Sequence, residues 1–233
     1  MMSRLTVLLF LLVAAAFADA PKLPSTVTRA EAMATAEMYR TFKWQPAAAN
    51  VFHGRDANGK RVDTPDVSYK PASGFSGYWK PGLVNKGMPY KWDGFDTPES
   101  FLIGIGAGKA AGDVCTPEKR RLLEAGTSVQ AVGIDCSGFV SRCWNLPQAY
   151  STRTITTLCD PIPNLRDLKP GDILNTHNSH VFLFKEWITA DCSKMAAYTT
   201  GTPPLWAVRS GMLRTKQMAP LGYTAWRYRG MRD

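Results

Sequence analysis

Apolar residues recur at helical spacing in the segment that follows residue 26, and polar residues fill most positions between them. This periodicity predicts a helix over about residues 28–44 that packs along one face. Thr28 suits the N-cap position, because Glu31 three residues later completes a capping box. The apolar stripe consists of Val27, Ala30, Ala34, Met38 and Phe42.

Two further helices carry start signals in the middle of the chain. Thr97 and Thr116 are each followed by a proline and then a glutamate, which is typical of a capped first helical turn. Gly126 is expected to end the second helix. Before them, residues 50–66 predict a short hairpin, and residues 69–88 predict an ordered loop rich in glycine, proline and aromatic side chains.

A glycine-containing turn leads into another helix, which is expected to begin near Cys136. Phe139, Val140 and Cys143 follow at spacings that give this helix an apolar face. Downstream segments have the alternating or strongly apolar patterns of β-strands. They are residues 168–174, where a turn feeds a strand, and residues 180–184, 195–200 and 223–229.

The first residues of the chain predict export. Arg4 precedes an unbroken apolar run over residues 5–16, and the Ala-Phe-Ala sequence at residues 16–18 suits a signal-peptide cleavage site. The run is too short to span a membrane, and no later segment qualifies. We therefore expect a signal peptide at residues 1–18. The mature chain would be soluble, in the periplasm or outside the cell in association with the cell wall.

Export affects how the five cysteines are interpreted, since an oxidising compartment favours disulfides. Four of them could pair in three ways and leave one free thiol, but five free thiols fit the sequence equally well. The cysteines are Cys115, Cys136, Cys143, Cys159 and Cys192.

The formal net charge is +9, and the basic residues are spread along the chain rather than gathered in one run. This distribution fits a solvated surface, or attraction to an anionic polymer such as a cell wall, and it argues against a nucleic-acid partner. The glycine-rich residues 104–109 fail both the phosphate-loop and the dinucleotide-binding patterns, so they predict no nucleotide site.

Cys136 is the candidate nucleophile. A thiol in the first turn of a helix lies near the partial positive charge of unpaired N–H groups, which favours the thiolate. The structural alternative is a small buried cysteine at a helix start. Of the three histidines, His180 is preferred as general base, because it opens an apolar strand that would hold it rigidly. His53 lies in the hairpin and His177 in a polar loop, and no cysteine or histidine spacing matches a metal site.

Three motifs follow one another along the chain. They are DCSGFV at residues 135–140, LKPGDI at residues 168–173 and SHVFLF at residues 179–184. In this order they resemble the NlpC family of papain-like cysteine peptidases of bacterial cell walls. The upstream sequence PYKWDG, which begins at Pro89, is similar to the Tyr-x-Trp-Gly-Gly segment of that family. The resemblance covers about residues 89–201. It divides the chain into the signal peptide, an N-terminal extension over residues 19–88 and a peptidase domain over residues 89–233.

The resemblance implies an α+β fold in which the Cys136 helix packs on an antiparallel sheet bearing His180. It also implies hydrolysis of peptidoglycan stem peptides at the bond between D-γ-glutamate and a diamino acid. Cys136 would attack the carbonyl carbon, and His180 would take the thiol proton and return it to the leaving amine. Tyr90, with the Cys136 backbone N–H, would stabilise the oxyanion. Asp135 and Ser137 would lie beside the cleft, where a carboxylate could meet the free amine of the substrate.

The chain departs from the family pattern upstream of the nucleophile. Asp93 replaces the first of the paired glycines, so a different local turn is expected. Forty residues separate Gly94 from Asp135, where many relatives have a short link. The two capped helices fill this insertion and are placed to reshape the cleft.

The third catalytic member also differs. Its position maps to Thr199, the preferred candidate, or to Thr200. A threonine hydroxyl can accept the imidazole N–H bond, but it stabilises an imidazolium less than a carboxylate does. Asp191 or Glu186 could act in its place.

Two other functions remain open. The same fold could act as an amide hydrolase or acyltransferase on other peptide amides, or the protein could be a catalytically silent module that binds cell-wall polymer. None of the three functions requires a cofactor. The oligomeric state is not indicated by the sequence.

Overall fold

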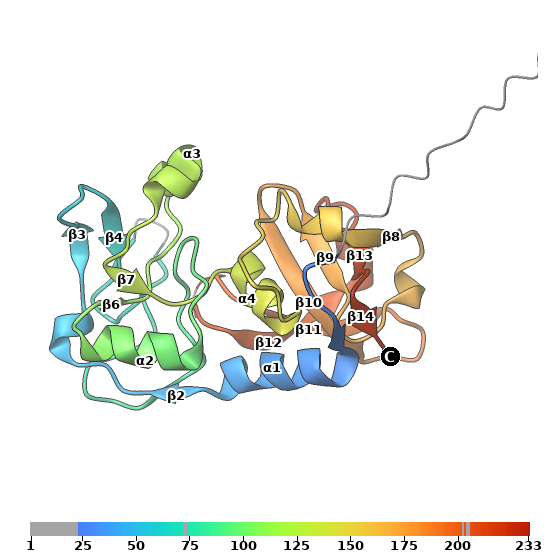
Figure 1. Ribbon diagram of the computed structural model, residues 1–233, viewed down its shortest axis with the longest axis horizontal. Coiled ribbons are helices and arrows are strands. Elements are labelled where there is room, and N and C mark those ends of the chain that lie inside the picture. Colours follow the sequence, from blue (N-terminus) through green and yellow to red (C-terminus); the bar gives the residue numbers. More distant parts are fainter. Residues whose placement is uncertain (1–22, 72–73, 202, 204–205) are drawn as a thin grey trace, which may run out of the picture.

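The computed structural model describes residues 23–71, 74–201, 203 and 206–233, so the predicted signal peptide lies outside the described residues. Within these ranges the protein is α+β, with four α-helices and a six-stranded antiparallel sheet (Figure 1). No helix in this part of the chain is long and apolar enough to cross a membrane. The helices are α1 (Arg29–Thr41), α2 (Pro98–Gly106), α3 (Pro117–Leu122) and α4 (Cys136–Cys143).

The sheet has the strand order β12-β11-β10-β9-β13-β8. In its centre, Leu183 of β10 pairs with Tyr198 of β11 on one side and with Ile173 of β9 on the other. All neighbouring strands are antiparallel. The strands are β8 (Cys159–Ile162), β9 (Ile173–Thr176), β10 (His180–Trp187), β11 (Lys194–Thr199), β12 (Arg209–Arg214) and β13 (Thr224–Tyr228).

Smaller strand pairs and 3-10 helices complete the fold. Strand β1 (Val27–Thr28) pairs in parallel with β14 (Met231–Arg232), and β2 (Lys43–Trp44) pairs with β5 (Asn85–Lys86). The predicted hairpin is formed by β3 (His53–Arg55) and β4 (Arg61–Asp63), whereas β6 (Ala110–Ala111) and β7 (Ala131–Val132) are parallel. The 3-10 helices are η1 (Ala48–Asn50), η2 (Leu123–Gly126), η3 (Ile155–Leu158), η4 (Leu165–Asp167) and η5 (Thr215–Gln217).

The predicted helix starts are confirmed. The Thr28 hydroxyl oxygen accepts a hydrogen bond from the Glu31 N–H at 3.2 Å, while the Glu31 carboxylate accepts from the Thr28 N–H at 2.8 Å. Thr97 forms a similar capping box with Ser100 at α2, and the Thr116 hydroxyl oxygen caps α3 by accepting a hydrogen bond from the Lys119 N–H. The second of these helices is shorter than expected, because Leu123 has a φ of 52° and the chain continues as η2 up to Gly126.

Helix α4 lies at the centre of the molecule, packed on β10 of the sheet on one side and on α1 on the other (Figure 1). This confirms the predicted packing of the Cys136 helix on an antiparallel sheet. Seven of its eight residues are buried, so the helix has almost no solvent face. The Phe139 ring packs edge-on against Tyr39 of α1, with ring centroids 5.9 Å apart.

Close backbone approach fixes the start of α4 against the segment that carries the Tyr-Lys-Trp motif. A Cβ atom on Gly138 would lie only 2.1 Å from the carbonyl oxygen of Gly94. Glycine is therefore required at this position of the Asp-Cys-Ser-Gly motif, because any side chain would force the helix away from residue 94. Figure 1 shows α4 between the sheet and the part of the molecule that holds α2, α3 and the β3–β4 hairpin.

Candidate active site

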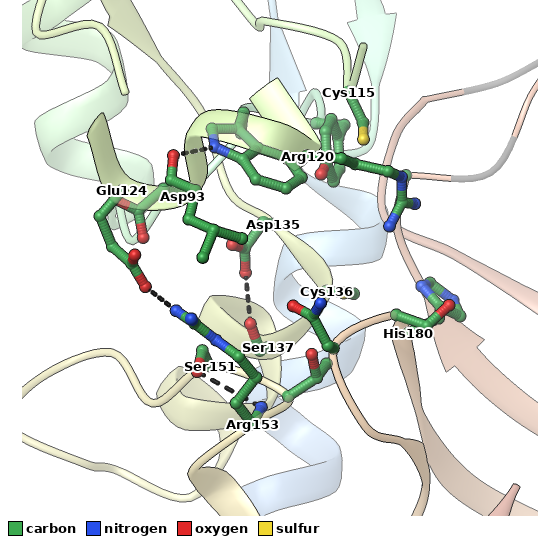
Figure 2. Close-up of a pocket in the computed structure, with 17 residues that line it drawn as sticks. Asp93, Cys115, Arg120, Glu124, Asp135, Cys136, Ser137, Ser151, Arg153 and His180 are labelled. Carbon is green, nitrogen blue, oxygen red and sulfur yellow. Dashed lines mark hydrogen bonds and ion pairs between the residues drawn. The ribbon is translucent and has the colours of Figure 1, made fainter. Parts of the chain in front are cut away.

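A pocket lies where the start of α4 meets the first residue of β10 and the segment that contains α3 and η2 (Figure 2). Every residue assigned a role from the sequence lines this pocket except Thr199, which lies behind His180. The lining residues used below are Tyr90, Trp92, Asp93, Cys115, Arg120, Leu123, Glu124, Asp135, Cys136, Ser137, Arg153, His180 and Gly201.

Cys136 is the first residue of α4, and the residue is 8% exposed. Burial raises the pKa of the Cys136 thiol to about 12, and repulsion from Asp135 acts in the same direction. Backbone N–H groups of Val181 and Ser137 favour the thiolate but are outweighed. The thiolate expected from the helix terminus is thus wrong for this resting site, because desolvation exceeds the effect of the partial positive charge. Because α4 packs on β10, Cys136 shares the pocket with His180 at the start of that strand.

His180 is the first residue of β10, so its backbone is fixed by pairing with Thr176 of β9. Its Nε2 lies 2.7 Å from the Thr199 hydroxyl oxygen on the neighbouring strand β11. This contact leaves Nδ1 as the ring nitrogen available to a reacting thiol. Burial lowers the pKa of His180 to about 4, assisted by the positive charges of Arg120 and Arg209.

The other candidates for orienting His180 lie elsewhere. Glu186 is six positions further along β10, about 20 Å away at the rise of a strand, and Asp191 lies in the turn beyond it. His53 contacts Asp63 and Ser68 at the hairpin and does not line the pocket.

Tyr90 is buried in the wall of the pocket, with its backbone N–H bonded to the Trp206 carbonyl oxygen at 2.7 Å. A Cβ atom on Gly201 would lie 2.5 Å from the Tyr90 ring, so this glycine makes room for the aromatic side chain. Burial raises the pKa of Tyr90 well above its ordinary value. The phenol therefore stays protonated and can donate a hydrogen bond.

Asp135 and Ser137 flank the nucleophile on either side. Asp135 caps α4, since its Oδ1 accepts hydrogen bonds from the Gly138 N–H at 2.6 Å and from the Ser137 hydroxyl at 3.0 Å. Burial raises the pKa of Asp135 to about 6. The observed role of Asp135 is therefore to stabilise the start of α4, and both of its hydrogen bonds are accepted by the same oxygen, Oδ1.

The turn before the insertion contains a residue with a left-handed backbone conformation. Asp93 has a φ of 57°, a conformation that glycine adopts readily and aspartate tolerates. Its Oδ2 accepts a hydrogen bond from the Thr127 hydroxyl at 2.8 Å. Asp93 therefore adds a carboxylate to a turn whose backbone has the left-handed conformation that glycine favours.

The insertion forms a second wall that the sequence analysis placed beside the cleft without naming its residues. Trp92 donates its indole N–H to the Leu123 carbonyl oxygen at 3.1 Å. This hydrogen bond connects η2 to the PYKWDG segment at residues 89–94. Glu124 of η2 forms an ion pair with Arg153, which follows α4, and this pair bridges one side of the pocket (Figure 2). Arg120 of α3 also lines the pocket.

All five cysteines are free thiols, so the disulfide alternative is not observed. Cys115 is the only other cysteine among the described residues that lines the pocket with Cys136. No group of three or more metal-binding side chains occurs within the described ranges.

Comparison of the chain with protein-family models, with curated proteins and with solved structures finds no significant match. Function is therefore inferred from the site itself.

Proposed function

We propose that this protein is an exported cysteine peptidase with a papain-like, NlpC-type core that hydrolyses peptidoglycan stem peptides. One observation carries the proposal. Cys136 and His180, which are distant in sequence, line one pocket on adjacent elements, and a third side chain, Thr199, contacts the histidine at 2.7 Å. A nucleophile, a base and a group that orients the base form the minimal arrangement for covalent amide hydrolysis.

The mechanism starts from two neutral groups, because the pKa of Cys136 is raised to about 12 and that of His180 is lowered to about 4. The Cys136 sulfur forms a bond to the scissile carbonyl carbon while its proton moves to His180. The imidazolium gives this proton to the leaving amine as the C–N bond breaks, and a thioester remains. Water then attacks the thioester with His180 as base, and the proton returns to the Cys136 sulfur as the acid product leaves.

Two donors are available for the oxyanion that forms during each attack. The first is the backbone N–H of Cys136, at the N-terminus of α4, where the helix dipole also favours negative charge. The second is the Tyr90 hydroxyl, which burial keeps protonated. Both belong to elements fixed by the contact between Gly138 and the Gly94 carbonyl oxygen.

The bond proposed is the one between D-γ-glutamate and the diamino acid of a stem peptide. The test is incubation of the purified protein with L-alanyl-γ-D-glutamyl-meso-diaminopimelate, followed by mass spectrometry. The expected products are L-alanyl-D-glutamate and free diaminopimelate. Cys136→Ala should release neither product while it keeps the unfolding midpoint of the wild type, and turnover by this variant would overturn the proposal.

The silent cell-wall-binding function is favoured by one observation, the low exposure and raised pKa of Cys136. If the wild type leaves the peptide intact but sediments with purified peptidoglycan, this function replaces hydrolysis. A panel of other peptide amides covers the remaining alternative, because an amide hydrolase or acyltransferase would consume a member of that panel instead.

A further inference from the structure

The insertion brings one arginine to the pocket without a carboxylate partner. Arg120 lies on α3, is exposed, and lines the pocket together with Cys136 and His180. Figure 2 shows its side chain extending from the insertion toward the side of the pocket that holds His180. Among the described residues, no carboxylate forms an ion pair with Arg120, whereas Arg55 and Arg153 each pair with a glutamate.

The other charged side chains that line the pocket are engaged with protein groups. Glu124 pairs with Arg153. Asp93 accepts a hydrogen bond from a threonine hydroxyl, and Asp135 caps the nucleophile helix. Arg120 contacts the thiol of Cys115, and among the described residues that line the pocket it is the arginine with no carboxylate paired to it.

The helix that carries Arg120 is anchored to the protein interior by its neighbour Lys119. The neighbouring Lys119 is 1% exposed and forms a buried ion pair with Asp113, and it also donates to the Val114 carbonyl oxygen at 3.3 Å. Successive residues of a helix point about 100° apart, so an inward Lys119 turns Arg120 out of the interior and toward the pocket. Arg120 is thus held on a fixed base rather than on a free loop.

The charge of Arg120 reaches the reacting groups. Burial is the main cause of the lowered pKa of His180, and the positive charge of Arg120 is the next largest cause. The same charge also acts on the Tyr90 hydroxyl, where it favours a lower pKa. An anionic group of a substrate bound near these side chains would therefore meet a guanidinium group. A guanidinium binds a carboxylate through two parallel hydrogen bonds, a geometry that an amide cannot match because it offers one acceptor oxygen and an opposing NH₂ donor.

We propose that Arg120 forms a carboxylate subsite, which selects stem peptides whose γ-linked glutamate has a free α-carboxylate over peptides in which that group is amidated. The proposal rests on the proposed function and names the substrate class of the same site. A γ-linked glutamate keeps its α-carboxylate within about 5 Å of the scissile carbonyl carbon, given the lengths of the intervening bonds. The wall formed by the insertion would thereby recognise the α-carboxylate of the glutamate whose γ-amide bond is cleaved.

The test compares two peptides that differ only at this group, L-alanyl-γ-D-glutamyl-meso-diaminopimelate and its D-isoglutamine counterpart. The wild type is expected to show a kcat/KM about 10- to 100-fold higher for the carboxylate peptide, the range of one charge-assisted contact. Arg120→Gln should lose this preference, chiefly by reacting more slowly with the carboxylate peptide, so that its kcat/KM values for the two peptides lie within about threefold of each other. Arg120→Lys, which keeps the charge but not the planar fork, should be intermediate.

Arg121→Gln is the matched control, because Arg121 is exposed on the same helix but does not line the pocket. It should retain the wild-type preference. Equal, measurable rates of cleavage of both peptides by the wild type, or an unchanged preference in Arg120→Gln, would overturn the subsite.

Binding separates failure of the subsite from failure of the proposed function. Calorimetric titration of both peptides into Cys136→Ala, with and without Arg120→Gln, measures the preference without turnover. Tighter binding of the carboxylate peptide that depends on Arg120 supports the subsite even where the wild type cleaves neither peptide. Equal or undetectable binding of both peptides overturns it.

Discussion

The two walls of the pocket are built by different means. The wall formed by α4 and β10 carries Cys136 and His180, and it is held by backbone pairing in the sheet and by almost complete burial of the helix. The wall formed by α3 and η2 is short and largely exposed, and side-chain contacts hold it, chiefly the buried pair of Lys119 with Asp113 and the pair of Glu124 with Arg153.

This difference separates two tasks. A wall fixed by its backbone keeps reacting atoms in register, which the proposed chemistry requires. A wall fixed by side chains can be altered by single substitutions while the sheet remains intact. Substitutions in the first wall should therefore affect every substrate equally, and those in the second should affect local stability and substrate preference.

The largest expected effect is loss of the nucleophile from the first wall. Cys136→Ala should lower kcat by about 10⁴-fold or more for any amide that the wild type cleaves, measured by product release. Cys143→Ala removes a thiol from the other end of the same helix and is the matched control. It should retain activity and lose only about 1–2 kcal/mol of stability, since Cys143 is buried but does not line the pocket.

In the second wall, the largest effect should follow loss of Lys119. Lys119→Ala leaves Asp113 buried without its counter-charge and should lower the free energy of unfolding by about 3–5 kcal/mol in chemical denaturation. The double variant Lys119→Met, Asp113→Leu should recover most of this loss. Arg121→Ala on the same helix should change stability by less than about 0.5 kcal/mol. A Lys119→Ala protein as stable as this control would show that the pair does not anchor the wall.

The contact between Thr199 and His180 allows a test of how the proposed general base is positioned. Thr199→Val keeps the shape of the side chain but removes the hydroxyl 2.7 Å from His180 Nε2, and it should lower kcat about 10²-fold with little change in KM. Thr199→Ser restores a hydroxyl and should recover most of the rate. An unchanged kcat in the valine variant would mean that the hydroxyl does not position the imidazole.

The smallest effect for a single step, about tenfold for each pH unit, concerns the charge of the nucleophile. Because the pKa of Cys136 is raised to about 12, the thiolate fraction should grow about tenfold per pH unit between pH 7 and pH 10. Alkylation of Cys136 by iodoacetamide, followed by peptide mass spectrometry, should rise with the same slope. The pKa of His180 is lowered to about 4, so imidazole titration should add no step in this window. A labelling plateau below pH 7 would reveal a thiolate–imidazolium pair instead.

Local signals in the sequence predicted most of the helix starts and the inner strands. Caps such as Thr28 and Thr97 work within one helical turn, so their signals are readable without tertiary context. Strands β8 and β12 were not predicted. The first contains Pro161 and lies at one edge of the sheet, and the second has a mostly exposed, mixed sequence at the other edge, so neither shows apolar alternation.

The candidate site was predictable only in part, for a related reason. Cys136, His180 and Tyr90 lie in short motifs, and the structure brings all three to one pocket. The predicted lowering of the Cys136 pKa was wrong, because the effect of the helix terminus is local, whereas burial of the thiol depends on the whole fold. Arg120 and Glu124 line the pocket through long-range placement of the insertion, which no local pattern reports.

The parallel pairing of β1 with β14 has a consequence for biogenesis. Val27 lies beside Met231, so the strand that leads into α1 has no partner while the nascent chain is still short of residue 231 on the ribosome. Helix α1, in turn, backs the helix that carries Cys136. The segment that leads into this supporting helix therefore completes its own strand pairing only after translation has passed residue 231.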